Sequence, residues 1–254
     1  MIYKNEKLTV DGHNIDLLAK KFKTPVYCYS FKKLKENILN FKKNFYKINP
    51  LICFAVKSNS NIKILKEIKK FNLGADVVSA GELMKAIKAG INPQKIVFSG
   101  VGKTTSEIEY AISKKLLLIN AESTSEILEI EKIAKQKKVV VSIGIRLNPN
   151  TDANTISQIS TGKKENKFGV NEKIFLDLVK YTKNSKNLNL KCLSVHIGSQ
   201  ILNHKPYEKM LKVVDKIINK SDYNFEYIDL GGGMGIDYAH NNKKLNLKRY
   251  SQSI

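Results

Sequence analysis

The chain of 254 residues is 42% hydrophobic and 26% charged, an ordinary globular composition that excludes a disordered or fibrous protein. No apolar run approaches the roughly 18 residues of a membrane span, and the start, MIYKNEKLTV, lacks the apolar stretch of a secretory signal, so we expect a cytoplasmic protein with no membrane partner. The net charge of +21 suggests nucleic-acid binding, but only Arg146 and Arg249 are arginines and the lysines are spread over polar helix faces, so we expect no nucleic-acid partner.

The first 29 residues are predicted to form a separate unit with a strand at 7–10, a helix at 14–22 and a strand at 25–30. From residue 30 onward, short apolar runs alternate with amphipathic helical stretches. The predicted strands are 51–56, 74–79, 95–100, 116–120, 139–147, 190–198 and 226–230. The predicted helices are 61–71, 80–90, 106–115, 123–136, 172–183 and 207–220. We therefore divide the chain into residues 1–29 and 30–254.

This alternation predicts βαβ units, and the continuously apolar strands are typical of parallel strands that are covered on both faces. Seven units are visible, whereas a (β/α)8 barrel needs eight. The chain is thus either an open doubly wound sheet or a TIM-type barrel that stops before its eighth strand. We favour the barrel. One connection, 148–170, is far longer than the usual 2–6 residues, so it is either functional or a disordered insertion.

The three cysteines, Cys28, Cys53 and Cys192, lie in apolar β-type runs without metal-ligand spacing. We expect buried thiols, no disulfide and no metal site.

Polar and glycine residues gather at the predicted carboxyl ends of the strands. These include Lys57, Asp76, Arg146, His196, Ser199 and Gly231 to Gly233. In a barrel or an open α/β sheet these ends share one edge, where active sites lie.

Two nucleotide-binding motifs are nearly matched but fail. The segment FSGVGKTT resembles a P-loop, but Val97 stands where the first glycine is required. The segment GGGMG is not a dinucleotide fingerprint, because Ile236 occupies the third glycine position.

The triple glycine at 231–233 could cradle a phosphate with its backbone N–H groups, helped by the Ser199 hydroxyl, or it could be a plain turn. A strand-end Lys57 that is partly desolvated would have a lowered pKa and could form a Schiff base; the alternative is a surface lysine. An amine beside a phosphate cradle suggests pyridoxal 5′-phosphate.

Three further residues have open roles. His196 could lie against the cofactor ring or relay a proton, or be a satisfied polar residue. Arg146 could serve the cofactor environment or a structural ion pair. Asp76 could pair with the Lys57 amine or cap a helix.

Seven motifs in this order resemble the fold-type III pyridoxal-phosphate decarboxylases, and among them the diaminopimelate decarboxylases. They are FAVKSN, DVVSAGEL, SGVGK, RLNP, STGKKENKFG, HIGSQ and DLGGGMG, over residues 24–237. The resemblance implies a barrel that carries the cofactor and a β-domain that includes the N-terminal strands. It makes Lys57 the Schiff-base lysine, places His196 on the cofactor ring and Ser199 with Gly231, Gly232 and Gly233 at the phosphate, and gives Asp76 and Arg146 polar positions nearby. The implied reaction converts the amino acid meso-diaminopimelate to L-lysine in a homodimer.

The sequence also departs from that family, whose members continue to a Glu-Pro-Gly-Arg-like motif and a β-domain that supplies a Cys and a Tyr to a partner subunit. We therefore expect an amino-terminal part that is nearly inactive alone. The alternatives are a decarboxylase of the ornithine, arginine or carboxynorspermidine type, an alanine racemase relative, and a non-catalytic pyridoxal-phosphate homeostasis protein.

Overall fold

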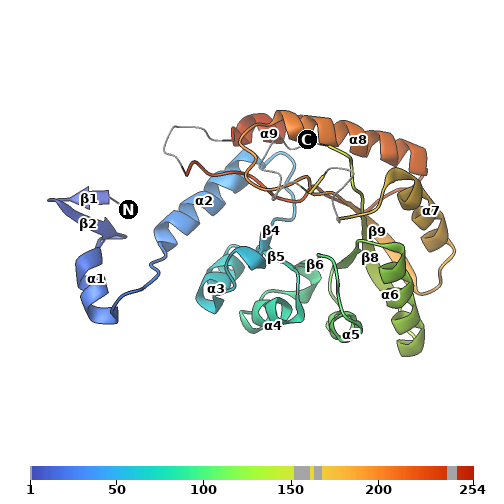
Figure 1. Cartoon of the computed structure of the whole chain (residues 1–254), viewed down its shortest axis with the longest axis horizontal. Coiled ribbons are helices and arrows are strands. Elements are labelled where there is room, and N and C mark those ends of the chain that lie inside the picture. The colour runs from blue at the N-terminus through green and yellow to red at the C-terminus, as the bar shows by residue number, and fades with distance from the viewer. Residues whose placement is uncertain (1, 152–160, 163–167, 239–244) are drawn as a thin grey trace. The chain divides into compact units, whose positions relative to one another are not determined.

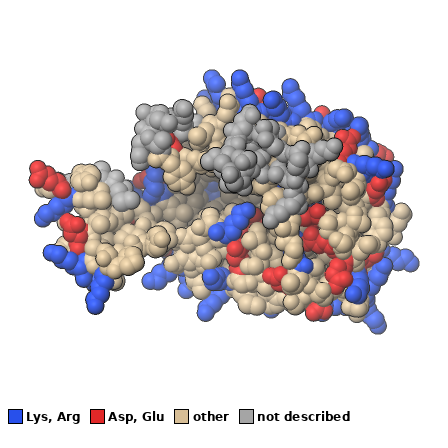
Figure 2. Space-filling model, in the orientation of Figure 1, with Lys and Arg blue, Asp and Glu red and all other residues tan. Residues whose placement is uncertain are grey.

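The computed structural model describes residues 2–151, 161–162, 168–238 and 245–254, which fall into two compact units, Met1–Pro50 and Leu51–Ile254 (Figure 1). The predicted boundary between residues 29 and 30 stays a prediction. Within the described ranges no helix has the length and apolarity to span a membrane. Lysine and arginine side chains are scattered over the face drawn in Figure 2 and do not form one patch.

The first unit contains a small antiparallel sheet and two helices. Its elements are β1 (Ile2–Lys4), β2 (Lys7–Val10), β3 (His13–Asn14), α1 (Ile15–Phe22) and α2 (Phe31–Asn44). The strand predicted over 25–30 is wrong, because this segment pairs with no strand in the described ranges and leaves Val26 and Tyr27 exposed. Cys28 is likewise exposed and not buried as expected. Helix α2 was not predicted, since its lysine-rich sequence buries only Ile38.

All seven strands predicted for the second unit are present in one parallel sheet. They are β4 (Cys53–Ala55), β5 (Gly74–Val77), β6 (Ile96–Phe98), β7 (Leu118–Ala121), β8 (Val141–Arg146), β9 (Leu188–Ser194) and β10 (Tyr227–Asp229), and each pairs with the next in chain order. This order is that of a barrel wall and not of a doubly wound sheet, whose strand order reverses. The barrel interpretation is therefore confirmed for the seven strands.

Helices lie along the outside of this sheet (Figure 1). They are α3 (Ile62–Lys70), α4 (Ala80–Lys88), α5 (Thr105–Ser113), α6 (Thr124–Lys137), α7 (Glu172–Lys183), α8 (Lys205–Ser221) and α9 (Leu247–Ser253), with short 3-10 turns η1 (Val56–Ser58) and η2 (Pro93–Lys95). The helices after β5, β6 and β7 each begin at a Ser or Thr cap whose hydroxyl accepts the backbone N–H of a glutamate three residues later. These caps fix where the strand-end segments turn into helices.

The sheet is strongly curled. The Asn120 side-chain amide on β7 donates to the Asp229 carboxylate on β10 over 3.0 Å, although β8 and β9 lie between them. Three strand spacings in a flat sheet would be about 14 Å, which two short side chains cannot span. The crossing also needs Gly144 on β8, because a Cβ there would lie 2.0 Å from Asn120 Oδ1. Curvature thus brings the ends of distant strands together.

The long connection after β8 begins and ends at the same point. The Asn148 N–H donates to Val170 O over 2.8 Å, and the Val170 N–H donates to Arg146 O over 2.9 Å. Residues 152–160 and 163–167, which carry most of the STGKKENKFG motif, lie outside the described residues. The two ends of the connection are therefore joined at the carboxyl end of β8.

Candidate active site

The predicted site residues lie at one edge of the parallel sheet. Lys57 is in η1 after β4, Asp76 is in β5, Arg146 ends β8, His196 follows β9, and Gly231 to Gly233 follow β10. His196 contacts the residues that follow β10 and end β8. Its Nδ1 accepts the Gly232 N–H over 3.3 Å, and its carbonyl accepts from the Arg146 guanidinium over 3.3 Å. Ser199 is exposed and, within the described ranges, makes no hydrogen bond to the glycine turn. All of the predicted residues thus lie at this edge of the sheet, and their binding roles stay predictions.

The glycine turn needs glycine at two positions and leaves open space at the third. Gly231 and Gly233 have positive φ values of 68° and 86°. A Cβ on Gly231 would lie 2.6 Å from Val195 O, and one on Gly233 would lie 1.8 Å from Gly198 O. A Cβ on Gly232 would have nothing within 4 Å. The turn therefore packs closely against the 195–198 segment while its middle residue faces an open space.

Two backbone amides of this turn have no acceptor in the described part of the chain. The Gly231 N–H donates to Asp229 Oδ1, and the Gly232 N–H donates to His196 Nδ1. The amides of Gly233 and Met234 donate to no described atom, although the Gly233 carbonyl accepts from Ile201. Adjacent free N–H groups of this kind are suited to bind an anion.

His196 is held as a neutral imidazole. Burial, together with the positive charges of Arg146 and Lys57, lowers the pKa of His196 to about 3. Because Nδ1 accepts a hydrogen bond from Gly232, the proton of the neutral ring must be on Nε2. The ring is thus held in one tautomer, with Nδ1 directed at the Gly232 amide.

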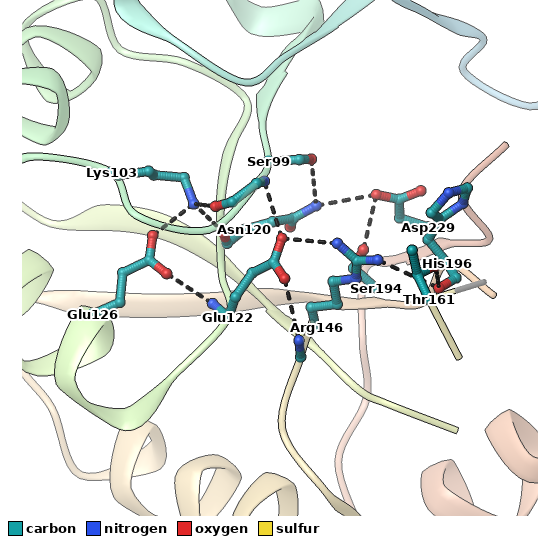
Figure 3. Close-up of polar contacts among 12 residues, drawn as sticks. Ser99, Lys103, Asn120, Glu122, Glu126, Arg146, Thr161, Ser194, His196 and Asp229 are labelled. Atoms are coloured by element: carbon teal, nitrogen blue, oxygen red, sulfur yellow. Dashed lines mark hydrogen bonds and ion pairs between the residues drawn. The ribbon is translucent and has the colours of Figure 1, made fainter. Parts of the chain in front are cut away.

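Arg146 forms a buried ion pair with Glu122, at 2.8 Å, in which the side chains are 9% and 1% exposed (Figure 3). The Glu122 carboxylate also accepts the N–H groups of Gly100, over 3.0 Å, and Gly169, over 3.2 Å. The guanidinium also lies over the Phe168 ring, with its Cζ 4.9 Å from the ring centroid. Glu122, which follows β7, therefore connects the carboxyl ends of β6, β7 and β8 through one carboxylate.

A polar layer lies inside the curled sheet around Asp76. Burial raises the pKa of Asp76 to about 6; a hydrogen bond from Ser99 and the charges of Lys57 and Arg146 oppose that rise, and Asp229 adds to it. Asp229 also accepts from Asn120 and Ser194 (Figure 3). Asp76 Oδ1 and Asn120 Oδ1 are buried and have no partner in the described ranges. This layer can hold a proton near neutral pH beside Lys57.

Lys57 differs from expectation in its burial. It is exposed, and not partly desolvated as predicted. Its charge nevertheless acts on both Asp76 and His196. Lys57 is thus close enough for its charge to act on these two residues.

Sequence reasoning missed Glu122 and did not place Asn120 or Asp229 in the site. All three stand at strand ends, but acidic and amide residues there are also typical of helix caps, so only the curl of the sheet reveals their contacts. The lysine of the P-loop-like segment, Lys103, is buried in an ion pair with Glu126, at 2.6 Å. Its role is to join two helix starts.

Comparisons with known proteins give one family model and several similar proteins. Residues 31–254 match the family model described as pyridoxal-dependent decarboxylase, pyridoxal binding domain. The chain is 43% identical to the diaminopimelate decarboxylase of Helicobacter pylori J99 over 95% of its length and 60% of the relative. It is 40% identical to the Campylobacter jejuni enzyme of that name over 93% of its length and 60% of the relative.

Solved structures give the same result. The crystal structure of Helicobacter pylori diaminopimelate decarboxylase complexed with L-lysine superposes with a TM-score of 0.91 at 43% identity, over 95% of this chain and 62% of that one. The chain thus spans about 60% of the length of the curated relatives it matches.

Proposed function

Because the chain belongs to the pyridoxal-dependent decarboxylases, whose pyridoxal-binding domain it matches over residues 31–254, we propose that it forms the cofactor-binding part of a diaminopimelate decarboxylase. The family implies pyridoxal 5′-phosphate as cofactor. The proposed reaction removes one carboxylate of meso-2,6-diaminopimelate and yields L-lysine, and the proposed assembly is a homodimer. The observation that carries the proposal is the clustering of a lysine, a neutral histidine and an open glycine turn at one sheet edge.

The residues present fit this cofactor. The amine of Lys57 would hold its aldehyde carbon, and the free amides at Gly233 and Met234 would bind its phosphate. The open space at Gly232 leaves room for that group, and Ser199 would add a hydroxyl. When bound, the cofactor supplies an electron-withdrawing ring that accepts the electron pair left by the departing carboxylate.

The protein side of the reaction is positioning and proton handling. His196 presents a neutral ring whose orientation is fixed by the Gly232 N–H and by the Arg146 contact with its carbonyl. Asp76, with a pKa of about 6, is partly protonated near neutral pH, and the positive charge of Lys57 acts on its carboxyl. Arg146 keeps positive charge close to both groups.

The cofactor assignment is tested by reductive trapping. The purified chain is incubated with pyridoxal 5′-phosphate, reduced with borohydride and digested, and the modified lysines are mapped by mass spectrometry. We expect one dominant modified residue, Lys57. Lys57→Arg should abolish that product, while the control Lys132→Arg, at a surface residue paired with Glu129, should not change it. Modification spread over the surface lysines without preference for Lys57 would refute the assignment.

The substrate is tested by carbon dioxide release from meso-diaminopimelate, ornithine and arginine. Since the chain spans about 60% of its relatives, it is assayed both alone and joined to the remaining carboxyl-terminal part of the Helicobacter pylori relative. We expect almost no turnover by the chain alone and release from diaminopimelate by the joined protein. Preference for ornithine or arginine would overturn the substrate, and turnover by the chain alone would overturn the expected inactivity.

A further inference from the structure

A buried tyrosine on α8 contacts the carbonyl of the middle glycine of the turn. The Tyr207 side chain is fully buried, and its hydroxyl donates to the Gly232 carbonyl over 2.9 Å. Its ring contacts that of Tyr250 in α9, with centroids 4.3 Å apart. Burial raises the pKa of the Tyr207 hydroxyl far above its usual range, so it remains a hydrogen-bond donor.

This hydrogen bond fixes the direction of the next amide. In a trans peptide the C=O of one residue and the N–H of the following residue point in opposite directions. With the Gly232 carbonyl held toward Tyr207, the Gly233 N–H must point away from α8. The Ile201 N–H does the same for the following peptide, because it donates to the Gly233 carbonyl over 2.8 Å and so orients the Met234 N–H.

The turn needs such a constraint because its residues are glycines. The Gly232–Gly233 peptide lies between two residues without Cβ atoms, so rotation of this peptide meets little steric resistance. The Cβ position of Gly232 has no neighbouring atom within 4 Å, whereas Gly231 and Gly233 on either side pack closely against the 195–198 segment. Among the described residues, the hydroxyl of Tyr207 is the hydrogen-bond partner of this peptide group itself, while His196 and Ile201 bind the groups on either side of it.

We infer that Tyr207 is a positioning residue for phosphate binding, whose hydroxyl holds the Gly232–Gly233 peptide with its N–H directed at the ligand. The inference rests on the proposed function, because it takes the glycine turn as the phosphate site. It assigns to a residue of α8, outside the strand ends, a specific part in recognising the phosphate group of the ligand.

The test compares two ligands that differ only in the phosphate. Pyridoxamine 5′-phosphate and pyridoxamine carry no aldehyde and so do not react with the many surface lysines, and their dissociation constants are measured by calorimetry. Tyr207→Phe keeps the ring and its contact with Tyr250 but removes the hydroxyl. Loss of one neutral hydrogen bond corresponds to about three- to tenfold in affinity.

The expected result is a three- to tenfold weaker binding of pyridoxamine 5′-phosphate by Tyr207→Phe with unchanged binding of pyridoxamine. Tyr223→Phe is the matched control, since its hydroxyl also donates to a carbonyl, that of Leu190 in β9, over 2.6 Å. This control should bind both ligands as the unaltered protein does. Equal weakening of both ligands by a folded Tyr207→Phe would overturn the inference, because the hydroxyl would then have no specific part in binding the phosphate.

The outcomes separate the inference from the proposed function. If the unaltered protein and Tyr207→Phe show the same preference for pyridoxamine 5′-phosphate over pyridoxamine, the inference is wrong and the phosphate site stands. If the unaltered protein binds both ligands equally, the phosphate site itself is wrong and the inference fails with it.

A second measurement needs no variant. In the unaltered protein, addition of pyridoxamine 5′-phosphate should shift the Gly233 amide proton resonance strongly and the Gly232 amide, already bonded to His196, much less. An unmoved Gly233 amide would overturn the inference even if Tyr207→Phe did not fold.

Discussion

Replacement of Glu122 by glutamine tests the buried contacts that hold the strand ends together. The carboxylate accepts three donors, from Arg146, Gly100 and Gly169, and its side chain is 1% exposed. Glutamine keeps one acceptor oxygen but turns an NH2 group toward donors, and it leaves the Arg146 charge buried without its partner. Breaking a buried ion pair on one side costs about 3–5 kcal/mol.

That loss is large against a total stability of about 5–15 kcal/mol, so the midpoint of urea unfolding, followed by circular dichroism, should fall markedly. The control is Glu67→Gln, whose partner Lys70 is 65% exposed; this change should cost less than about 1 kcal/mol. The double variant Glu122→Gln with Arg146→Met should lose about 1–3 kcal/mol less than the sum of the two single variants. The reasoning fails if Glu122→Gln stays within 0.5 kcal/mol of the unaltered protein, or if the two losses are additive.

Two further changes test the interior of the sheet. Gly144→Ala places a Cβ 2.0 Å from Asn120 Oδ1 and should lower the unfolding free energy by about 1–3 kcal/mol, measured by urea unfolding; an unchanged midpoint would show that Asn120 does not cross β8. Asp76→Asn tests how the free energy of unfolding depends on pH. The carboxyl has a folded pKa of about 6 against 3.8 in the unfolded chain, so the stability it contributes is present below pH 3.8 and is lost as pH rises through 6. The stability of Asp76→Asn relative to the unaltered protein should therefore rise by about 2–3 kcal/mol between pH 4 and 7, and a flat difference would contradict the buried carboxyl. His196, which is present in both proteins, cancels in this comparison.

The strands of the second unit could be predicted because strands that are buried on both faces have continuously apolar sequences. Ala75, Phe98, Ile119 and Ile143 are all almost completely buried, and each belongs to a short apolar run followed by a capped helix. In the first unit an apolar sequence does not correspond to a buried strand. Residues 25–30 are apolar without pairing, and α2 is a helix with only Ile38 buried, so composition there does not report burial.

The candidate site was predictable in position but not in its contacts. A parallel sheet brings its strand ends to one edge, so Lys57, His196 and the glycine turn could be grouped from the sequence. The partners of the site residues depend on tertiary contacts. Glu122 reaches Arg146, and Tyr207 reaches Gly232, across separations of 24 and 25 residues that no periodic pattern encodes. The exposure of Lys57 could not be predicted either, since it depends on which residues cover the carboxyl ends of the strands.

The two ends of the connection after β8 are hydrogen-bonded to each other, so the length of the connection does not determine the geometry of the sheet. Asn148, Val170 and the Arg146 carbonyl form a closed base through two backbone hydrogen bonds, and Glu122 holds the adjacent Gly169. The entropy of closing a loop grows only slowly with its length, so residues added or removed beyond this base would change stability little. Changes of length in this connection would then leave Arg146 and its ion pair with Glu122 in place.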